Sequence, residues 1–363
     1  MRDIAIVSFA QTKHERSVES INEVEMLMPL LKEALDGAGI TKDRVDFVCS
    51  GSSDYLAGQP FSFVMTLDAF GPWPPISESH VDMDGAWAVY ESWVKMQAGK
   101  VDIALVYAYG KSSPGDIRRV LSRQLDPYYQ QPLWPDSVAL AALQARAGLD
   151  AGTFTAEQMA EVAAASRRNA KANQFAQVTG DADVASLLEE PEFLAPLRKH
   201  DCAPVSDGAA VVILAAEDVA NELSSRPAWI RGFDHRIEAH SLGVRDLTTS
   251  ASTRIAGEKA GVGQGKVDIA ELHAPFSHQE LILREALGLG DDVSVNPSGG
   301  ALCANPVMAA GLVRMGEAAT RISRGDGDRA VAHATSGPCL QQNLVCVLDA
   351  DRGAGNDNGQ GGE

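Results

Sequence analysis

Short apolar runs alternate with amphipathic stretches along the first half of the chain. Runs typical of buried strands begin at Ile4, Val45 and Val101, and residues 23–38 and 86–98 show the spacing of helices between them. Runs of Val, Ile and Ala that alternate with helices are typical of parallel strands with helices on both faces. The first half therefore predicts an α/β sheet.

The second half repeats this order at similar spacing. Its expected strands begin at Ala228, Val267 and Asp328, and its expected helices cover 249–261, 279–287 and 306–322. The recurrence predicts two similar halves, 1–225 and 226–351. Two ordinary Rossmann-like domains are the alternative, but no G-x-G-x-x-G stands between a strand and a helix.

Two further segments depart from the repeat. Residues from about 110 to 200 carry aromatics and prolines near 127–135, then amphipathic helices, and we expect this insertion to lie over one end of the sheets. Residues 207–214 return to the first core as a buried strand. The tail, 352–363, is rich in glycine and asparagine without an apolar anchor, which predicts disorder.

Composition narrows the class of protein. The chain has 363 residues, 45% hydrophobic and 22% charged, as expected for a soluble globular protein. A net charge of −18 argues against nucleic acid as a partner, although a local basic patch can still bind an anion. No apolar run of about 18 residues predicts a membrane span, and the N-terminus lacks signal-peptide features.

Five dispersed cysteines bear on compartment and metal binding. They are Cys49, Cys202, Cys303, Cys339 and Cys346. No C-x-x-C pair occurs, so we expect no structural zinc or other metal site within the chain. An odd, scattered set is typical of reduced thiols, which favours a cytoplasmic location.

Four short motifs carry a family resemblance. They are Pro204-Val-Ser-Asp-Gly-Ala-Ala210, Glu271-Leu-His-Ala-Pro-Phe276, Asn296-Pro-Ser-Gly-Gly300 and His333-Ala-Thr-Ser-Gly337. Together they resemble the thiolase superfamily, most closely its sterol-carrier-protein-like (lipid-transfer) thiolases. The resemblance covers Asp3 to about Asp351 and implies the thiolase fold, in which duplicated βαβαβαββ halves form a five-layer αβαβα core.

The chain departs from the family at the nucleophile and the base. In a working thiolase a cysteine at a helix N-terminus attacks the acyl group. In the matching region, 80–86, Met83 falls at the expected nucleophile position, and a thioether cannot be acylated. Asn305 falls where the family has a histidine base, and asparagine takes no proton near neutral pH. Cys339 lies near the family's second cysteine, but its spacing fits poorly. We therefore expect no cysteine-based acyl transfer.

The resemblance also implies what chemistry can remain. His273 lies at the loop position that holds the thioester oxygen in the family, and such a donor stabilises an enolate as readily as a tetrahedral intermediate. Retro-aldol cleavage of a β-hydroxyacyl-CoA passes through an enolate and needs a base and an acid. Some cysteine-less relatives are steroid side-chain aldolases that work with a small zinc-ribbon/OB-fold partner. They use tyrosines at two loops, where this chain has His273 and Asn305.

Other candidate site residues have structural alternatives. Asp84 is either an acid–base group or a helix N-cap. Cys303 and His333 are either part of the site or buried core residues, and His273 itself has a structural reading. Arginines of the insertion are candidates to bind the phosphates of CoA, although each alone is usually a solvated side chain. They are Arg118, Arg119, Arg167 and Arg168.

Three functions stay open at this point. The first is an enzyme, a retro-aldolase acting on a bulky β-hydroxyacyl-CoA of a steroid (cholesterol-type) side chain. The second is a non-catalytic subunit of a thiolase-like complex, and the third is an acyl-CoA or lipid carrier. We expect a coenzyme A thioester as the substrate and no covalently bound cofactor. The family implies a dimer, either with an identical chain or with a paralogue.

Overall fold

Ten strands follow one continuous order, β10-β9-β11-β12-β8-β1-β7-β4-β2-β3, in a computed structural model that describes residues 1–58 and 60–352. Five belong to the first half: β1 (Ile4–Gln11), β2 (Phe47–Gly51), β3 (Glu78–Val81), β4 (Ile103–Lys111) and β7 (Asp207–Ala216). Five belong to the second: β8 (Ala228–Ile237), β9 (Ile269–Leu272), β10 (Ser294–Val295), β11 (Arg329–Ser336) and β12 (Gln342–Asp349).

The two halves share one topology. In each, the strands lie in the spatial order third, second, fourth, fifth, first, and the fifth strand runs antiparallel to its neighbours. The halves meet where β1 pairs with β8 over only two residue pairs, Ala5–Trp229 and Ile6–Ala228. The predicted βαβαβαββ duplication is therefore confirmed.

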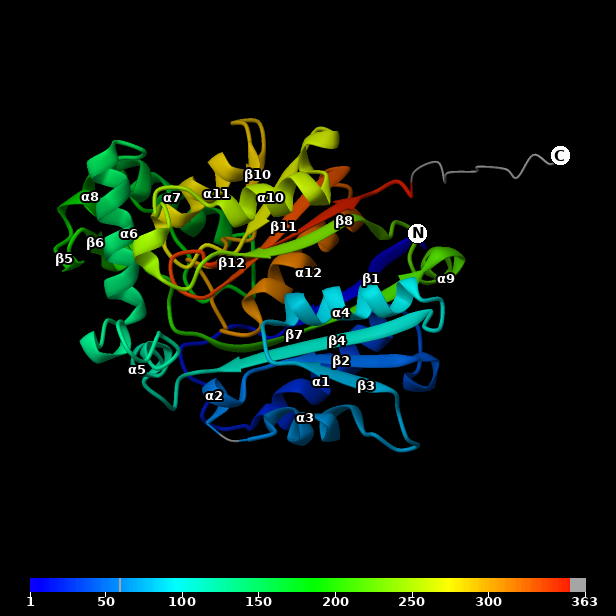
Figure 1. The fold of residues 1–363 in the computed structure, drawn as a ribbon. Helices are drawn as coiled ribbons and strands as arrows, with labels where there is room; N and C mark the ends of the chain where they lie inside the picture. The colour runs from blue at the N-terminus through cyan, green and yellow to red at the C-terminus, as the bar shows by residue number, and fades with distance from the viewer. Residues whose placement is uncertain (59, 353–363) are drawn as a thin grey trace.

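Helices complete the layers. They are α1 (Glu23–Gly37), α3 (Ser62–Phe70), α4 (Gly85–Gln97), α10 (Ala251–Ala260), α11 (Ser277–Leu287) and α12 (Ala310–Arg324). Helices α1 and α3 cover the outer face of the first sheet, α10 and α11 cover the second, and α4 and α12 lie between the sheets (Figure 1). This is the five-layer αβαβα core that the resemblance implies.

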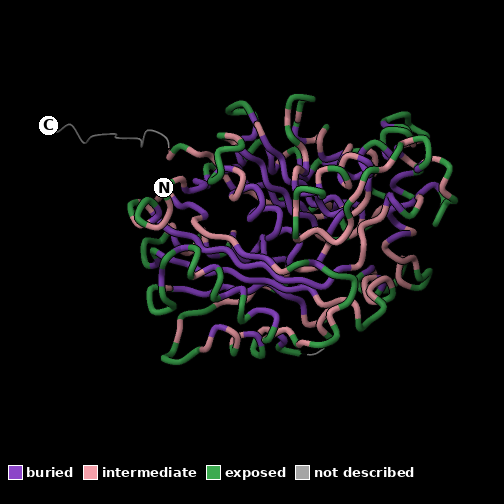
Figure 2. Tube along the Cα trace, turned by 180° about the vertical axis from the view of Figure 1, so that it is seen from behind, coloured by how far each residue is buried: buried purple, intermediate pink, exposed green. Residues whose placement is uncertain are grey.

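The central helix pair is largely buried because a sheet packs on each face, although Glu91 and Val94 of α4 are exposed. The two helices approach closely at Gly85, where an added Cβ would lie 2.6 Å from Ala108 Cβ and 3.0 Å from Leu312 Cβ. Glycine is therefore required for this contact. The strands beside the pair are the most continuously buried part of the molecule (Figure 2). The contact fixes the N-terminal ends of both helices next to each other.

The insertion lies at one end of the sheets, as predicted, and forms the left side of the molecule in Figure 1. It contains α5 (Ile117–Ser122), α6 (Ser137–Ala151), α7 (Ala156–Ala170), α8 (Val184–Glu189) and the hairpin β5 (Glu192–Leu194) with β6 (Leu197–Arg198). Elsewhere α2 (Asp54–Ala57) and α9 (Glu217–Leu223) are short connections, and 3₁₀ turns occupy 42–44, 131–133, 199–201, 242–244 and 262–264.

One helix begins later than its sequence pattern predicts. The predicted helix 306–322 is wrong at its start, because α12 begins at Ala310 and residues 304–309 form a loop. Met308 has a φ of 79° in this loop, and its carbonyl accepts a hydrogen bond of 2.8 Å from Gly85 N–H. A helix through Met308 would lose this connection between the two halves.

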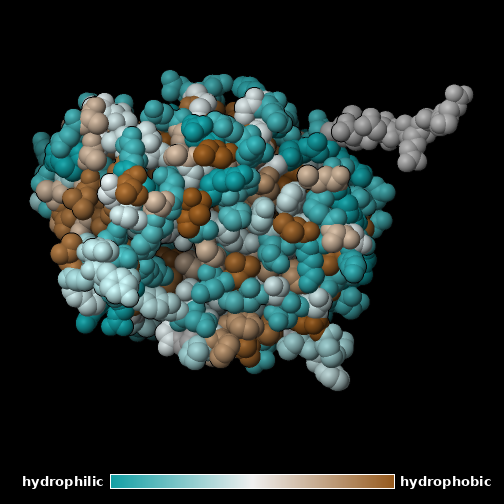
Figure 3. Space-filling model, in the orientation of Figure 1, coloured by the Kyte–Doolittle hydropathy of each residue, from teal (hydrophilic) through white to brown (hydrophobic). Residues whose placement is uncertain are grey.

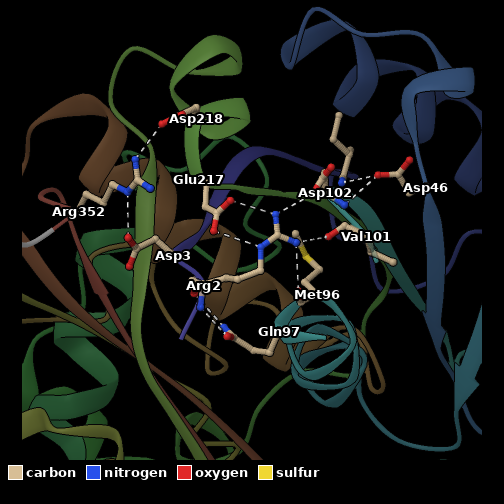
Figure 4. A network of polar contacts seen from close by, with 11 residues as sticks. Arg2, Asp3, Asp46, Met96, Gln97, Val101, Asp102, Glu217, Asp218 and Arg352 are labelled. Carbon is tan, nitrogen blue, oxygen red and sulfur yellow. Dashed lines mark hydrogen bonds and ion pairs between the residues drawn. The ribbon is translucent and has the colours of Figure 1, made fainter. Parts of the chain in front are cut away.

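Arg2 and Arg352, near the two ends of the described chain, form ion pairs at the seam between the halves (Figure 4). Arg2 bonds to Asp102 at 2.6 Å and to Glu217 at 3.2 Å, while Arg352 bonds to Asp3 at 2.9 Å and to Asp218 at 3.0 Å. The predicted disordered tail lies outside the described residues beyond Arg352. The domain limits at 225 and 351 stay predictions. No helix among the described residues is long and apolar enough to cross a membrane.

Candidate active site

A cavity of about 950 Å³ lies between the insertion and the strand ends. Figure 3 shows apolar side chains gathered over the insertion beside a hollow. Its apolar wall includes Ile117, Leu121, Leu125, Val138, Leu140 and Phe276. Its polar end includes Asp84, Ser206, His273, Asn305 and Thr335. A large apolar pocket with a few convergent polar groups is the usual form of a small-molecule site.

Asp84 caps both central helices. Its Oδ1 accepts hydrogen bonds from the backbone N–H of Ala86 at 2.9 Å and of Leu312 at 3.1 Å, and its Oδ2 accepts from Gly311 N–H at 2.9 Å. The predicted N-cap of α4 is therefore confirmed. Burial raises the pKa of the Asp84 carboxyl to about 6, against the lowering effect of the three N–H donors. A carboxyl with such a pKa is a usable base near neutral pH.

His273 and Asn305 form the second polar group of the cavity. His273 Nε2 lies 3.0 Å from Asn305 Oδ1, and Thr335 N–H lies 3.4 Å from His273 Nδ1. Burial, together with the charges of His333 and Arg314, lowers the pKa of His273 to about 3, against the raising effect of the hydrogen bond to Asn305. The imidazole is therefore neutral at physiological pH.

The two polar groups lie close together through α12 and β11. A Cβ added to Gly311 would meet Asp84 Oδ1 at 2.5 Å and Ala334 Cβ at 2.6 Å. Ala334 precedes Thr335, which contacts His273, and Asn305 precedes α12 by five residues. Asp84, His273 and Asn305 therefore face one end of the cavity from different elements.

The sequence motifs form the turns that hold these side chains. In the Asn296 turn, Asn296 Oδ1 accepts from Leu272 N–H at 2.7 Å, directly before His273. In the Pro204 turn, Ser206 Oγ accepts from Asn305 N–H at 3.0 Å. Behind the site, Glu271 pairs with Arg314 at 2.7 Å, and both side chains are buried. Several motif residues therefore hold the cavity-lining side chains in place without lining the cavity themselves.

Only some of the predicted cationic residues reach the cavity. Arg118 and Arg167 line it, whereas Arg119 and Arg168 do not. Arg118 also forms an ion pair with Asp136. Arg16 and Lys199 line the cavity as well. Arg16 was missed because nothing in the local sequence links residue 16 to an insertion that begins nearly a hundred residues later.

Besides Arg119 and Arg168, three further predicted site residues lie outside the cavity lining. His333 is fully buried in β11 and contacts Asn343 Oδ1 at 3.0 Å. Cys303 is fully buried, and burial raises the pKa of its thiol to about 12. Met83 packs against the central core directly before the helix end, where Asp84 is the residue that lines the cavity. Asp84 rather than Met83 is therefore the residue of this segment that faces the cavity.

The thiols that do line the cavity are not activated. Burial raises the pKa of Cys202 and of Cys339 to about 12. Cys339 Sγ lies 3.4 Å from the Leu140 carbonyl, and Cys202 Sγ lies 3.6 Å from the Arg198 carbonyl. Because the thiolate is the nucleophilic form, neither cysteine is poised for attack.

Known proteins agree with the fold. The solved structure described as an Ltp2-ChsH2(DUF35) aldolase matches with a TM-score of 0.81 and 18% identity, covering 97% of this chain and 98% of that one. Human mitochondrial 3-ketoacyl-CoA thiolase matches with a TM-score of 0.75 and 17% identity, over 96% and 99%. The protein therefore has the thiolase fold.

Proteins similar in sequence include acetyl-CoA acetyltransferases and sterol carrier protein 2. The acetyl-CoA acetyltransferase of Methanothermobacter thermautotrophicus is 26% identical over 366 residues, covering 93% of this chain and 95% of the relative. Sterol carrier protein 2 of Gallus gallus is 24% identical over 387 residues, covering 94% and 70%. No protein-family model matches the chain. The chain therefore has the thiolase fold and is similar in sequence to acetyl-CoA acetyltransferases and to sterol carrier protein 2.

Proposed function

We propose that this protein is a retro-aldolase that cleaves a bulky β-hydroxyacyl-CoA. One observation supports this most: the polar end of the cavity combines a buried carboxylate, Asp84, with the neutral pair His273 and Asn305. The cysteines that line the same cavity carry raised pKa values. A carboxylate and neutral donors suit enolate chemistry, whereas thiolysis requires a thiolate nucleophile.

The reaction balances with these groups alone. Asp84 takes the proton of the β-hydroxyl group, and the Cα–Cβ bond breaks as the C=O of the released aldehyde or ketone forms. The bonding electron pair becomes the enolate of the shorter thioester, whose oxygen accepts a hydrogen bond from the His273–Asn305 pair. Asp84 then returns its proton to the α-carbon, which regenerates the carboxylate.

The walls of the cavity support a bulky apolar substrate. A volume of about 950 Å³ is at the upper end for small-molecule pockets, and the insertion supplies Ile117, Leu121, Leu125, Val138 and Leu140 to its apolar wall. We propose a steroid side chain of the cholesterol type as the acyl group. Arg16, Arg118, Arg167 and Lys199 are the cationic residues of the lining that we propose for the CoA phosphates.

A second protein is part of the proposal. The structural neighbour is described as an aldolase of Ltp2 with ChsH2(DUF35), which names two components. We propose that this chain likewise acts with a small zinc-ribbon/OB-fold partner, and as a dimer with itself or with a paralogue. Assays should therefore compare the chain alone with the chain plus its partner.

The test is a cleavage assay with a steroidal β-hydroxyacyl-CoA, without added free CoA, read by mass spectrometry. The proposal expects a shorter acyl-CoA and a steroid ketone or aldehyde in equal amounts. His273→Ala should lower the rate, whereas His240→Ala, at an exposed position outside the cavity, should not. Absence of product with and without the partner would refute the proposal for this substrate. Tight substrate binding in that case would favour a carrier, and activity only with a thiolase-like paralogue would favour a non-catalytic subunit.

A further inference from the structure

We propose that the side-chain nitrogen of Asn305 is the group that donates to the thioester oxygen, and that His273 is a positioning residue that fixes the orientation of this amide. The inference deepens the proposed function and rests on it. It assigns the oxyanion contact to a residue that cannot ionise, at the position where a thiolase has a histidine.

The direction of each hydrogen bond follows from its donor. A backbone N–H can only donate, so the contact of 3.4 Å between Thr335 N and His273 Nδ1 makes Nδ1 the acceptor. A neutral imidazole carries one proton, which must then lie on Nε2. Nε2–H therefore donates to Asn305 across 3.0 Å, and the atom that accepts is the amide oxygen.

This arrangement determines which atom is left for a ligand. Both ring nitrogens of His273 are engaged, and the residue is only 7% exposed. Asn305 is half-buried and lines the cavity, and no group among the described residues accepts from its Nδ2. With the amide oxygen turned toward His273, the two N–H bonds of Nδ2 are the donors available at this end of the cavity.

The backbone of Asn305 is held as firmly as its side chain. Its N–H donates to Ser206 Oγ at 3.0 Å, and the next residue, Pro306, forms a bridge with Ser206. Gly110 packs against the same loop so closely that an added Cβ would lie 2.2 Å from the Val307 carbonyl oxygen. A donor fixed in this way stabilises developing charge without reorganising during the reaction.

Two consequences separate this arrangement from a histidine donor. An amide neither gains nor loses a proton in the physiological pH range, so the oxyanion contact is present at every pH at which the protein is folded. An amide also cannot protonate the enolate carbon, so that proton must come from another group, for which Asp84 is placed at the helix ends of the same cavity.

The first test measures the His273 tautomer by ¹⁵N NMR of the unliganded protein, with the signal assigned by its loss in His273→Gln. The inference expects the Nε2–H form without titration from about pH 5 to about pH 8. The Nδ1–H form, or protonation within that range, would overturn it. This measurement tests which atom of the Asn305 amide faces His273, whether or not the protein cleaves any substrate.

The second test is a double-mutant cycle on exchange of the α-protons of acetyl-CoA with D₂O, which requires enolate formation but no aldol substrate. Asn305→Ala should lower the exchange rate by about 10²- to 10³-fold. His273→Asn, which reaches only as far as Nδ1, should lower it by about 10- to 10²-fold through misplacement of the amide. His273→Gln, which places an N–H near Nε2, should restore most of the rate.

The cycle distinguishes whether His273 acts by orienting Asn305 or contacts the thioester itself. The double variant His273→Asn/Asn305→Ala should exchange α-protons no more slowly than Asn305→Ala alone, because residue 273 then has no amide to orient. Losses that multiply would show that His273 contacts the thioester itself and would overturn the inference. Exchange without cleavage of any β-hydroxyacyl-CoA would refute the retro-aldolase proposal and leave the assignment of Asn305 intact.

Discussion

The buried pair of Glu271 and Arg314 offers a sharp test of how the site is held. Arg314 Nη1 on α12 lies 2.7 Å from Glu271 Oε2 at the end of β9, and their side chains are 3% and 0% exposed. Ser298 completes the cluster: its hydroxyl donates to Glu271 at 2.7 Å and accepts from Arg314 at 2.6 Å. Glu271 lies two residues before His273, so the pair supports the loop that carries His273 directly.

Arg314→Met should destabilise the protein strongly. Removing one partner leaves a carboxylate without a countercharge in the core, and such changes cost about 3–5 kcal/mol. Burial already raises the pKa of Glu271, and loss of Arg314 would raise it further, so Glu271 would take up a proton at a higher pH. The double variant Glu271→Met/Arg314→Met removes both charges and should cost only about 1–3 kcal/mol, mainly from the unpaired polar groups of Ser298.

Urea unfolding followed by circular dichroism measures both values from the midpoint and slope. Arg254→Met is the matched control: Arg254 pairs with Glu258 at 2.7 Å, but the side chains are 55% and 62% exposed, so we expect a loss of about 0.5 kcal/mol or less. A loss below about 1 kcal/mol for Arg314→Met, or a double variant less stable than Arg314→Met, would refute the reasoning.

Three further predictions test the site. Burial raises the pKa of Asp84 from 3.8 to about 6. The contribution of Asp84 to the unfolding free energy should therefore fall by about 3 kcal/mol as the pH rises from about 4 to above 6. Urea unfolding of Asp84→Asn over the same pH range should lack this decrease. Iodoacetamide should label no cysteine of the native protein rapidly at about pH 7.5, because burial raises every thiol pKa; one fast site by mass spectrometry would contradict this. Gly110→Ala should displace the loop of Asn305, lower the unfolding free energy by about 1–3 kcal/mol and lower turnover. Gly115→Ala, with open space around the added methyl group, should change neither stability nor turnover. Equal effects of the two variants would contradict a role of this loop in holding Asn305.

The duplication could be predicted because the strands that define it are continuously apolar. Strands β4 and β7 are buried along nearly their whole length, so their continuous apolar sequences indicate buried strands without any tertiary information. The edge strand β3 was missed, since it is only partly buried and shows no apolar run. Strand β12 was also missed, although it is buried from Asn343 to Leu348 and lies in the centre of its half of the sheet order, so an apolar run did not identify every central strand.

The site was predicted less completely, for a physical reason. His273 and Asn305 were found because motifs mark both loops, but their partner Thr335 depends on the pairing of β11 with β9, which places His333 beside Leu272. The late start of α12, after the loop that contains Met308, depends on Gly85, more than two hundred residues earlier. Contacts between distant segments of this kind leave no signal in the local sequence.

The central claim is carbon–carbon cleavage through an enolate without a cysteine intermediate. Its most direct test is to run the cleavage of a steroidal β-hydroxyacyl-CoA in D₂O, without free CoA, while recording the intact mass of the protein. In the first turnovers we expect one deuterium at the α-carbon of the shorter acyl-CoA, with further deuterium entering only by later exchange, an equal amount of ketone or aldehyde, and no acyl adduct on the protein. Products that require free CoA, together with an acylated cysteine, would contradict it.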